Sequence, residues 1–228
     1  RTWIGERGGT TTPSSSATVA RKSIGRIAGS GTKSGTSSSP TRESAAMTSK
    51  PLASLLVDLL DVGSGQVVLD VGCGLGGSVE LITELRPDAH VIGLNIDPRQ
   101  LARCRTVAAP ATGSVDWLRA DALGIPLGAA TVDRVLCLEA LPHFASRAGF
   151  FQEASRVLRP GDRVVVTDLL VRPGAPAALG IAPAELARRL HEELGPWPDA
   201  AAQRQDVVDV AAAAGLRCTT WIDATRAT

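Results

Sequence analysis

The sequence predicts an α/β fold built on a doubly wound, mostly parallel sheet. Short runs rich in β-branched residues recur along the chain, such as "QVVLDVG" and "RVVVTDLL", and runs of this kind are typical of strands buried on both faces. Segments with a helical spacing of leucine and valine separate these runs. Strands that alternate with helices form parallel sheets, which bind ligands at the carboxyl ends of the strands.

Composition narrows the class of protein further. The chain has 228 residues, of which 44% are hydrophobic and 21% are charged, and its formal net charge is +1. This length suits a single α/β domain, and the charge balance argues against nucleic acid as a partner. No apolar run approaches the roughly 18 residues that span a membrane. The four cysteines and three histidines lack metal-binding spacings, so we expect no metal site and reduced thiols, as in a cytoplasmic protein.

The N-terminal segment, residues 1–46, differs in composition from the rest. It is rich in Ser, Thr and Gly, poor in acidic residues and without periodicity, which predicts disorder. All three lysines fall within the first fifty residues, and the only methionine is Met47. We therefore interpret residues 1–46 as non-native or as upstream translation, and residues 47–228 as the folded domain. An organelle transit peptide and a functional flexible tail are the alternatives.

The elements of the domain follow from local signals. Pro51 suits the first turn of a helix whose leucines share one face, and Gly215 suits a helix C-terminus. The tetrapeptide "RPGD" is expected to end the helix before it. The expected series is helix 51–62, strand 66–72, helix 77–85, strand 89–95, helix 98–108, strands 114–120 and 131–139, helix 150–158, strand 163–170, helices 183–194 and 206–214, and strand 216–223.

A glycine-rich turn follows the first of these strands in "VLDVGCGLGG". Gly72, Gly74 and Gly76 allow positive φ angles and a close approach of the backbone to a ligand. Because Gly72, Gly74 and Gly77 also match the dinucleotide fingerprint G-x-G-x-x-G, an NAD-dependent oxidoreductase is an open alternative. Asp70 argues against it, since a carboxylate beside this turn repels a pyrophosphate. S-adenosylmethionine fits better, because it carries an ammonium and a sulfonium but no phosphate.

The stretch "VIGLNIDPRQ" contains two candidates for binding a ribose. Asp97 precedes Pro98 and has Gln100 three residues later, which predicts a helix N-cap with a capping-box-like arrangement. Asn95 ends the strand about twenty residues after the glycine turn, where a ribose partner is expected, with Ile96 beside it. An amide can donate and accept, although it binds a ribose less strongly than a carboxylate does.

Four motifs in order give the chain a family resemblance. They are "VLDVGCGLGG", "VIGLNIDPRQL", "RADALGIPLGAATVDRVLCLEALPHF" and "EASRVLRPGDRVVVTDLL", within a span of roughly Ser54 to Asp223. With these motifs the chain resembles class I S-adenosylmethionine-dependent methyltransferases, especially bacterial enzymes that methylate sugar or polyketide natural products. The resemblance implies a Rossmann-like sheet of seven strands. It also implies methyl transfer from S-adenosylmethionine to a small-molecule acceptor, most simply a hydroxyl, in secondary metabolism.

The resemblance also assigns roles to single residues in cofactor binding. Asp121, in "RADAL", matches the acid that accepts a hydrogen bond from the adenine amino group, although an Asp there is also a common turn cap. Ala122 would supply the neighbouring N–H group, and Leu138 would offer its carbonyl to the cofactor ammonium. The methionine part of the cofactor would lie against Asp70, Gly72, Gly74 and Gly76.

A general base is the remaining requirement if the acceptor is a hydroxyl. Histidine suits this task because its pKa lies near working pH. His143, in "LEALPHF", is the candidate, and Pro142 stands where relatives often have another histidine. Asp168 is expected either to accept a hydrogen bond from His143 or to bind substrate. The alternatives are that His143 is an ordinary loop histidine and that Asp168 caps the end of its strand. Trp197 either forms part of a substrate lid or anchors a loop through apolar contacts.

The end of the chain departs from the resembled family. Relatives have an antiparallel seventh strand after the sixth, whereas this sequence stops at Thr228, shortly after "LRCTTWIDAT". We therefore expect a C-terminally short domain whose sheet lacks its last strand and has an unpaired edge. A truncated remnant that binds the cofactor with little turnover is the second functional hypothesis. The residues identify neither the acceptor nor the oligomeric state.

Overall fold

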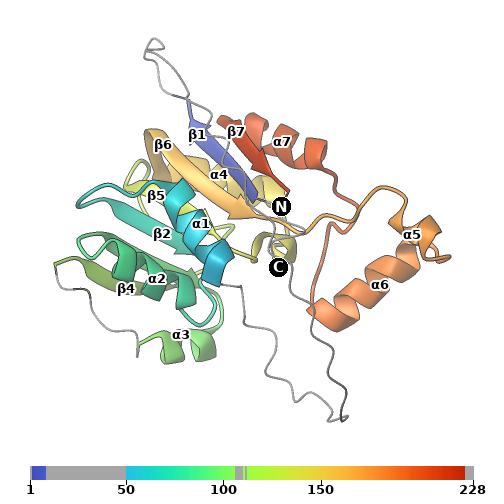
Figure 1. The fold of residues 1–228 in the computed structure, drawn as a ribbon, viewed down its shortest axis with the longest axis horizontal. Coiled ribbons are helices and arrows are strands. Elements are labelled where there is room, and N and C mark those ends of the chain that lie inside the picture. The colour runs from blue at the N-terminus through green and yellow to red at the C-terminus, as the bar shows by residue number, and fades with distance from the viewer. Residues whose placement is uncertain (1, 9–49, 106–109, 111, 224–228) are drawn as a thin grey trace, which may run out of the picture. The chain divides into compact units, whose positions relative to one another are not determined.

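The computed structural model describes residues 2–8, 50–105, 110 and 112–223. Within these ranges the strands form one seven-stranded sheet in the order β4-β3-β2-β5-β6-β1-β7 (Figure 1). The strands are β1 Thr2–Arg7, β2 Val67–Val71, β3 His90–Asn95, β4 Ser114–Arg119, β5 Val132–Cys137, β6 Leu158–Thr167 and β7 Leu216–Ile222. The helices are α1 Lys50–Leu60, α2 Gly77–Leu85, α3 Pro98–Cys104, α4 Arg147–Val157, α5 Ala175–Ala178, α6 Pro183–Leu194 and α7 Arg204–Ala213.

The sheet is mostly parallel, as the sequence predicts. The pairs from β4 to β6 are all parallel, and β1 is antiparallel to both of its neighbours, β6 and β7. Side chains of successive residues alternate between two cores. One core contains buried residues of α1, α2 and α3, and the other contains buried residues of α4 and α7. The helices therefore cover both faces, which confirms the doubly wound α/β fold.

Strand β1 corrects two predictions about the chain ends. Thr2–Arg7 is a strand of the sheet, so the prediction that residues 1–46 lie outside the fold is wrong for this stretch. The remaining predicted disorder, over residues 9–46, lies outside the described residues. The sheet also has its antiparallel seventh strand, which comes from the N-terminal end of the chain rather than from a segment after β7. The predicted sheet without its last strand is therefore not found in the described part of the chain.

Burial explains why such a short strand is held firmly. Trp3 is 1% exposed and joins the core beneath α4, whereas Ile4 is 4% exposed and joins the core beneath α1. The Trp3 indole packs edge-on against Phe151, with ring centroids 5.1 Å apart. Gly5 makes room for this ring, because a Cβ atom there would lie 2.1 Å from it. The strand therefore contributes to both layers of the domain.

Several element boundaries differ from those expected. Helix α4 begins at Arg147, earlier than predicted, because the Ser146 hydroxyl accepts a hydrogen bond from Gly149 N–H and caps the helix. The "RPGD" sequence lies inside β6, which follows α4 without a loop. Helix α3 ends at Cys104, and residues 106–108 of the predicted helix lie outside the described part of the chain.

The topology indicates at which end of the sheet a ligand would bind. Strand β2 lies between β3 and β5, so the chain leaves β2 toward β3 and β4 and later returns to β5 on its other side. Open α/β sheets bind ligands where the strand order reverses in this way. The glycine turn after β2 and the segment after β5 therefore meet at this switch point.

Candidate active site

The glycine turn has the geometry that its sequence predicts. Gly72, Gly74 and Gly76 have φ angles of +78°, +56° and +89°. The N–H groups of Gly72 and Cys73 both donate to the Leu94 carbonyl, at 2.9 and 3.1 Å, which fixes the turn to β3. Gly76 is the N-cap residue of α2, so the turn leads directly into a helix N-terminus. The backbone here can approach a ligand closely.

Gly72→Ala is expected to destabilise the protein. An added Cβ would lie 2.4 Å from the Cβ of Ala140, and such overpacking costs roughly 1–3 kcal/mol beyond the cost of a positive φ angle. Gly65→Ala is the matched control, because Gly65 also has a positive φ, +67°, but no atom within 4 Å of the added Cβ. Thermal unfolding of both variants measures the difference, and equal losses would show that the contact with Ala140 does not matter.

Asp70 is a buried carboxylate at the base of the turn. Its side chain has no exposed surface, and its Oδ2 accepts a hydrogen bond from the Ser78 hydroxyl. Its Oδ1 has no hydrogen-bond partner among the described residues. Burial raises the pKa of Asp70 to about 7, although the Ser78 hydrogen bond offsets part of that rise. A buried acceptor of this kind suits a cationic ligand, such as the ammonium of an amino acid.

Asn95 connects the glycine turn to the start of α3. Its amide nitrogen donates to the Gly74 carbonyl at 3.1 Å and to Gln100 Oε1 at 2.7 Å, and its Oδ1 accepts from Asp97 N–H at 3.1 Å. Both N–H groups are thus used within the protein, and any bond to a ribose would have to use the remaining lone pair of Oδ1.

Asp97 is the N-cap of α3, as predicted. Its carboxylate accepts from Arg99 N–H at 2.8 Å and binds the Arg99 guanidinium, with Pro98 in the first turn. These contacts hold the pKa of Asp97 at about 2. The predicted capping box is wrong in one respect, because the Gln100 side chain bonds Asn95 rather than Asp97 N–H. The amide of Asn95 takes that role instead.

The other predicted cofactor residues lie after β3, β4 and β5. Asp121 is exposed, and its Oδ1 accepts from Leu123 N–H at 2.9 Å, so the turn-cap alternative is realised. Ala122 is buried and Leu138 is half-buried. Ile96 is 63% exposed, a large exposure for an apolar side chain next to a predicted site.

A strained residue marks the tip of β5. Glu139 has a φ of +54°, and its N–H donates to the Thr167 hydroxyl at 2.6 Å. Such a conformation costs on the order of 1–3 kcal/mol in a non-glycine residue, and residues of this kind cluster at functional sites. This hydrogen bond ties the end of β5 to the end of β6.

His143 lies on a 3₁₀ turn, Leu141–His143, and its side chain is exposed. Its Nδ1 lies 2.8 Å from the Pro196 carbonyl. Because a carbonyl can only accept, we assign the hydrogen to Nδ1, and in the neutral ring Nε2 is then the nitrogen that can take a proton. The ring also packs edge-on against Trp197, with centroids 6.4 Å apart. The arrangement suits a general base.

Asp168 does not bond to His143, contrary to one of the two predicted roles. It is 2% exposed, and its two oxygens accept from Arg147 Nε and Nη2 at 2.9 and 3.0 Å. Both carboxylate oxygens thus bind Arg147 in a buried, bidentate ion pair. Burial raises the pKa of Asp168, and the Arg147 guanidinium lowers it in part.

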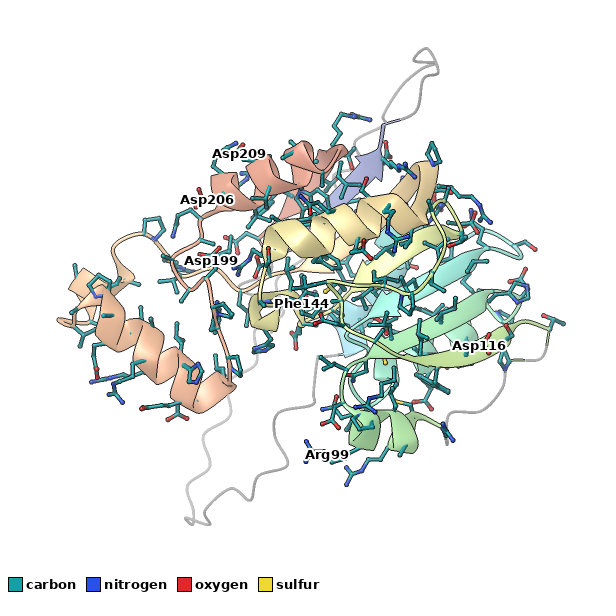
Figure 2. The ribbon with its side chains drawn as sticks, turned by 180° about the vertical axis from the view of Figure 1, so that it is seen from behind. Arg99, Asp116, Phe144, Asp199, Asp206 and Asp209 are labelled. Carbon is teal, nitrogen blue, oxygen red and sulfur yellow. The ribbon has the colours of Figure 1, made fainter. Side chains whose placement is uncertain are left out.

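Arg147 is a buried charged residue of this region that the sequence motifs do not point to. Its Nη1 reaches the Asp199 carbonyl at 3.1 Å and the Asp199 carboxylate at 3.2 Å, in addition to the pair with Asp168. Figure 2 shows Asp199 on the connection between α6 and α7. One signal was available, since a cation in the first turn of a helix opposes the helix dipole and suggests a paired role.

A separate cavity of about 240 Å³ lies beside α6. Its lining is mainly apolar and combines the segment after β6, α6 and the segment before α7. The lining includes Val171, Leu186, Leu190, Ala200, Ala201 and Gln203. None of the predicted cofactor residues lines it.

The described part of the chain has neither a membrane-spanning helix nor a cluster of metal ligands. Within the described ranges, no helix has the length and apolar character needed to cross a membrane. No cluster of three or more His, Cys, Asp or Glu side chains in the same ranges could hold a metal ion.

Known proteins are similar to this chain in sequence and in fold. Residues 69–166 match the family described as "Methyltransferase domain". O-methyltransferase rstn1 of Aspergillus nomiae is 33% identical over 138 residues, 59% of this chain and 58% of the relative. Erythromycin 3''-O-methyltransferase of Saccharopolyspora erythraea is 32% identical, over 58% of this chain and 45% of the relative. The chain thus spans about half the length of these curated relatives.

A solved structure of another protein has a similar fold. A putative sarcosine dimethylglycine methyltransferase from Galdieria sulphuraria aligns with a TM-score of 0.61 and 19% identity, covering 73% of this chain and 62% of that one. At this identity the likeness concerns the fold alone. Together with the family match and the glycine turn at the switch point, it shows that the chain has a Rossmann-like sheet and that its residues 69–166 are similar to a methyltransferase domain.

Proposed function

We propose that this protein transfers a methyl group from S-adenosylmethionine to a hydroxyl of a small-molecule acceptor in secondary metabolism. One observation carries the proposal: the buried Asp70 carboxylate, whose Oδ1 has no partner in the described part of the chain, lies beside the glycine turn. This arrangement suits the ammonium of S-adenosylmethionine and repels the pyrophosphate of NAD. The names of the curated relatives, which include O-methyltransferases, support the choice of acceptor group.

The cofactor would lie across the carboxyl ends of β2, β3, β4 and β5. Asn95 and Ile96 would border the ribose, while Asp121 and Ala122 would face the adenine. Because both Asn95 N–H groups bind within the protein, we expect a weaker hold on the ribose than a carboxylate would give. The methionine part would contact Asp70, Gly72, Gly74, Gly76 and the Leu138 carbonyl.

The cofactor supplies a methyl group already activated by its sulfonium. The protein has to align the acceptor oxygen with that methyl, and alignment of this kind can contribute about 7–11 kcal/mol. His143 would take the hydroxyl proton on Nε2, while its Nδ1–H remains bonded to the Pro196 carbonyl. Asp168 would act indirectly, through Arg147.

The direct test combines binding with turnover. Calorimetry with S-adenosylhomocysteine and with NAD is expected to show binding of the former alone. Transfer of a labelled methyl group from S-adenosylmethionine is then screened across hydroxylated macrolide sugars, polyketides and phenols. Binding of NAD without binding of S-adenosylhomocysteine would reverse the assignment in favour of an oxidoreductase.

His143→Ala is expected to lower kcat by roughly 10²- to 10⁴-fold, the usual contribution of a general base. The Kd for S-adenosylhomocysteine should stay the same, because His143 lies outside the predicted cofactor contacts. His90→Ala is the control, since His90 is exposed at the opposite end of its strand, near Ser114. Full turnover by the His143 variant would remove the residue from the mechanism.

We also propose a cytoplasmic location. All four cysteines are free thiols, and three of them are buried. Reduced, buried cysteines are typical of proteins from a reducing compartment.

A further inference from the structure

The segment 169–203, here called the lid, leaves the end of β6, contains α5 and α6, and returns to the start of α7 (Figure 1). Few of its side chains are buried, and these are Trp197 and Ala202. Helix α6 has no buried residue. Apolar burial therefore contributes little to the placement of the lid, and its position must depend on a few specific contacts.

Two of these contacts come from the segment that follows β5. His143 Nδ1 bonds the Pro196 carbonyl, and Arg147 Nη1 binds both the carbonyl and the carboxylate of Asp199. Arg147 is itself fixed, because Asp168 holds two of its nitrogens in a planar, bidentate pair. The side chains of Arg147 and Asp168 are 5% and 2% exposed, so solvent screens this pair weakly.

We propose that Arg147 is a positioning residue that sets the place of the lid and, through it, acceptor binding. Asp168 orients the guanidinium so that Nη1 points at Asp199, and this fixes the return segment 196–199 against His143. The following residues Ala200, Ala201 and Gln203 form one wall of the lid cavity. The role in acceptor binding rests on the proposed function, whereas the placement of the lid does not.

The chemistry of arginine explains why this residue type is needed. A guanidinium presents five N–H donors in a rigid plane, so it can bind Asp168 on one edge and Asp199 on another. A lysine at position 147 keeps the charge but has a single nitrogen, which cannot reproduce both sets of bonds. Gln203 adds a second tie, since its Nε2 donates to the Val171 carbonyl at 3.2 Å across the base of the lid.

The contacts of Arg147 lie on the proposed acceptor side of the site and not on the cofactor side. They involve the ends of β6 and α4 and the lid, and none of the predicted cofactor residues takes part in them. Loss of the contact between Arg147 and Asp199 is therefore expected to change the position of the lid and the KM for the acceptor. The Kd for S-adenosylhomocysteine is expected to stay unchanged.

Asp199→Ala in the full chain is the sharpest test. The Asp199 side chain is 59% exposed, so its removal leaves the buried Arg147–Asp168 pair intact and should not prevent folding. Hydrogen exchange measured by mass spectrometry is expected to rise at least threefold in peptides from residues 175–203. Glu193→Ala is the matched control, because Glu193 is an exposed lid carboxylate on α6. Arg147→Lys is expected to give at least the increase of Asp199→Ala, because it also loses the bond to the Asp199 carbonyl, and Asp199→Glu is expected to restore protection in part.

Turnover separates positioning from general stability. With an acceptor found by the methyl-transfer screen, Asp199→Ala is expected to raise its KM several-fold and to change kcat less. The proposal would be overturned if hydrogen exchange in Asp199→Ala and in Arg147→Lys equalled that in Glu193→Ala. A tenfold change in the Kd for S-adenosylhomocysteine in either variant would also overturn it. If the unmodified protein fails to bind S-adenosylhomocysteine, the proposed function fails, while the exchange measurement still decides the role of Arg147.

Discussion

Asp70→Asn is expected to weaken binding of S-adenosylhomocysteine by roughly 10- to 150-fold at pH 8. Hydrogen bonds to a charged group contribute about 1.5–3 kcal/mol, and the substitution removes the charge that would face the ligand ammonium. Isothermal titration calorimetry measures the loss. Asp121→Asn is a useful comparison, because Asp121 is exposed and would face the uncharged adenine.

The pH dependence of binding gives the same residue a second test. Burial raises the pKa of Asp70 to about 7, so the carboxylate loses its charge as the pH falls through neutrality. Affinity for the ligand ammonium should therefore fall by about tenfold between pH 8 and pH 6. The Asp70→Asn variant should show no such fall, and a matching slope in the variant would assign the effect to another group.

The same pKa shift predicts how stability changes with pH. In the unfolded chain Asp70 has a pKa near 3.8, so between this value and about 7 the folded state binds more protons. Its contribution to stability is full below pH 3.8 and is lost as the pH rises to about 7, by on the order of 4 kcal/mol. The ligand-free protein is thus destabilised by the carboxylate that we propose binds the ligand ammonium, and such a cost is common at functional sites.

Trp3→Ala is expected to destabilise the protein by about 3–5 kcal/mol, the range for removing a buried large aromatic side chain. Trp3 is 1% exposed and contacts Phe151, so little of the lost volume can be refilled. Trp221→Ala is the matched control, because Trp221 pairs with Trp3 across β1 and β7 but is only half-buried. Urea unfolding measures both. Equal losses, or no loss for Trp3, would show that β1 adds little to the sheet.

Local sequence patterns predicted those parts of the structure that depend on residues close together in the chain. The strand, glycine turn and helix from Val67 to Leu85, and the N-cap at Asp97, follow from residue types within one or two turns of each other. The partners of Asp168 and His143 could not be predicted in this way, because Arg147 and Pro196 lie 21 and 53 residues away. Such contacts depend on how the lid returns to the sheet, which the motifs do not encode.

Strand β1 was missed for a related reason. The six residues "TWIGER" are too short to stand out, and the segment that follows them is low in complexity. Its strand character depends on Trp3 and Ile4 entering two different cores and on pairing with β6 and β7. A glycine two residues after a tryptophan, on the same face of a strand, was the available clue, since the missing side chain at Gly5 accommodates the indole.

The place of β1 also sets the order in which this domain can be assembled during synthesis. Ile4 bonds Thr219, and Glu6 pairs with Arg163 and Arg217, at sequence separations of 215, 157 and 211 residues. A ribosome therefore produces β1 well before the strands that will flank it, and the segment must wait for β6 to emerge and then for β7. Such non-local pairing slows folding. The protein should therefore acquire protease resistance after translation, in one late step, rather than gradually as the chain grows.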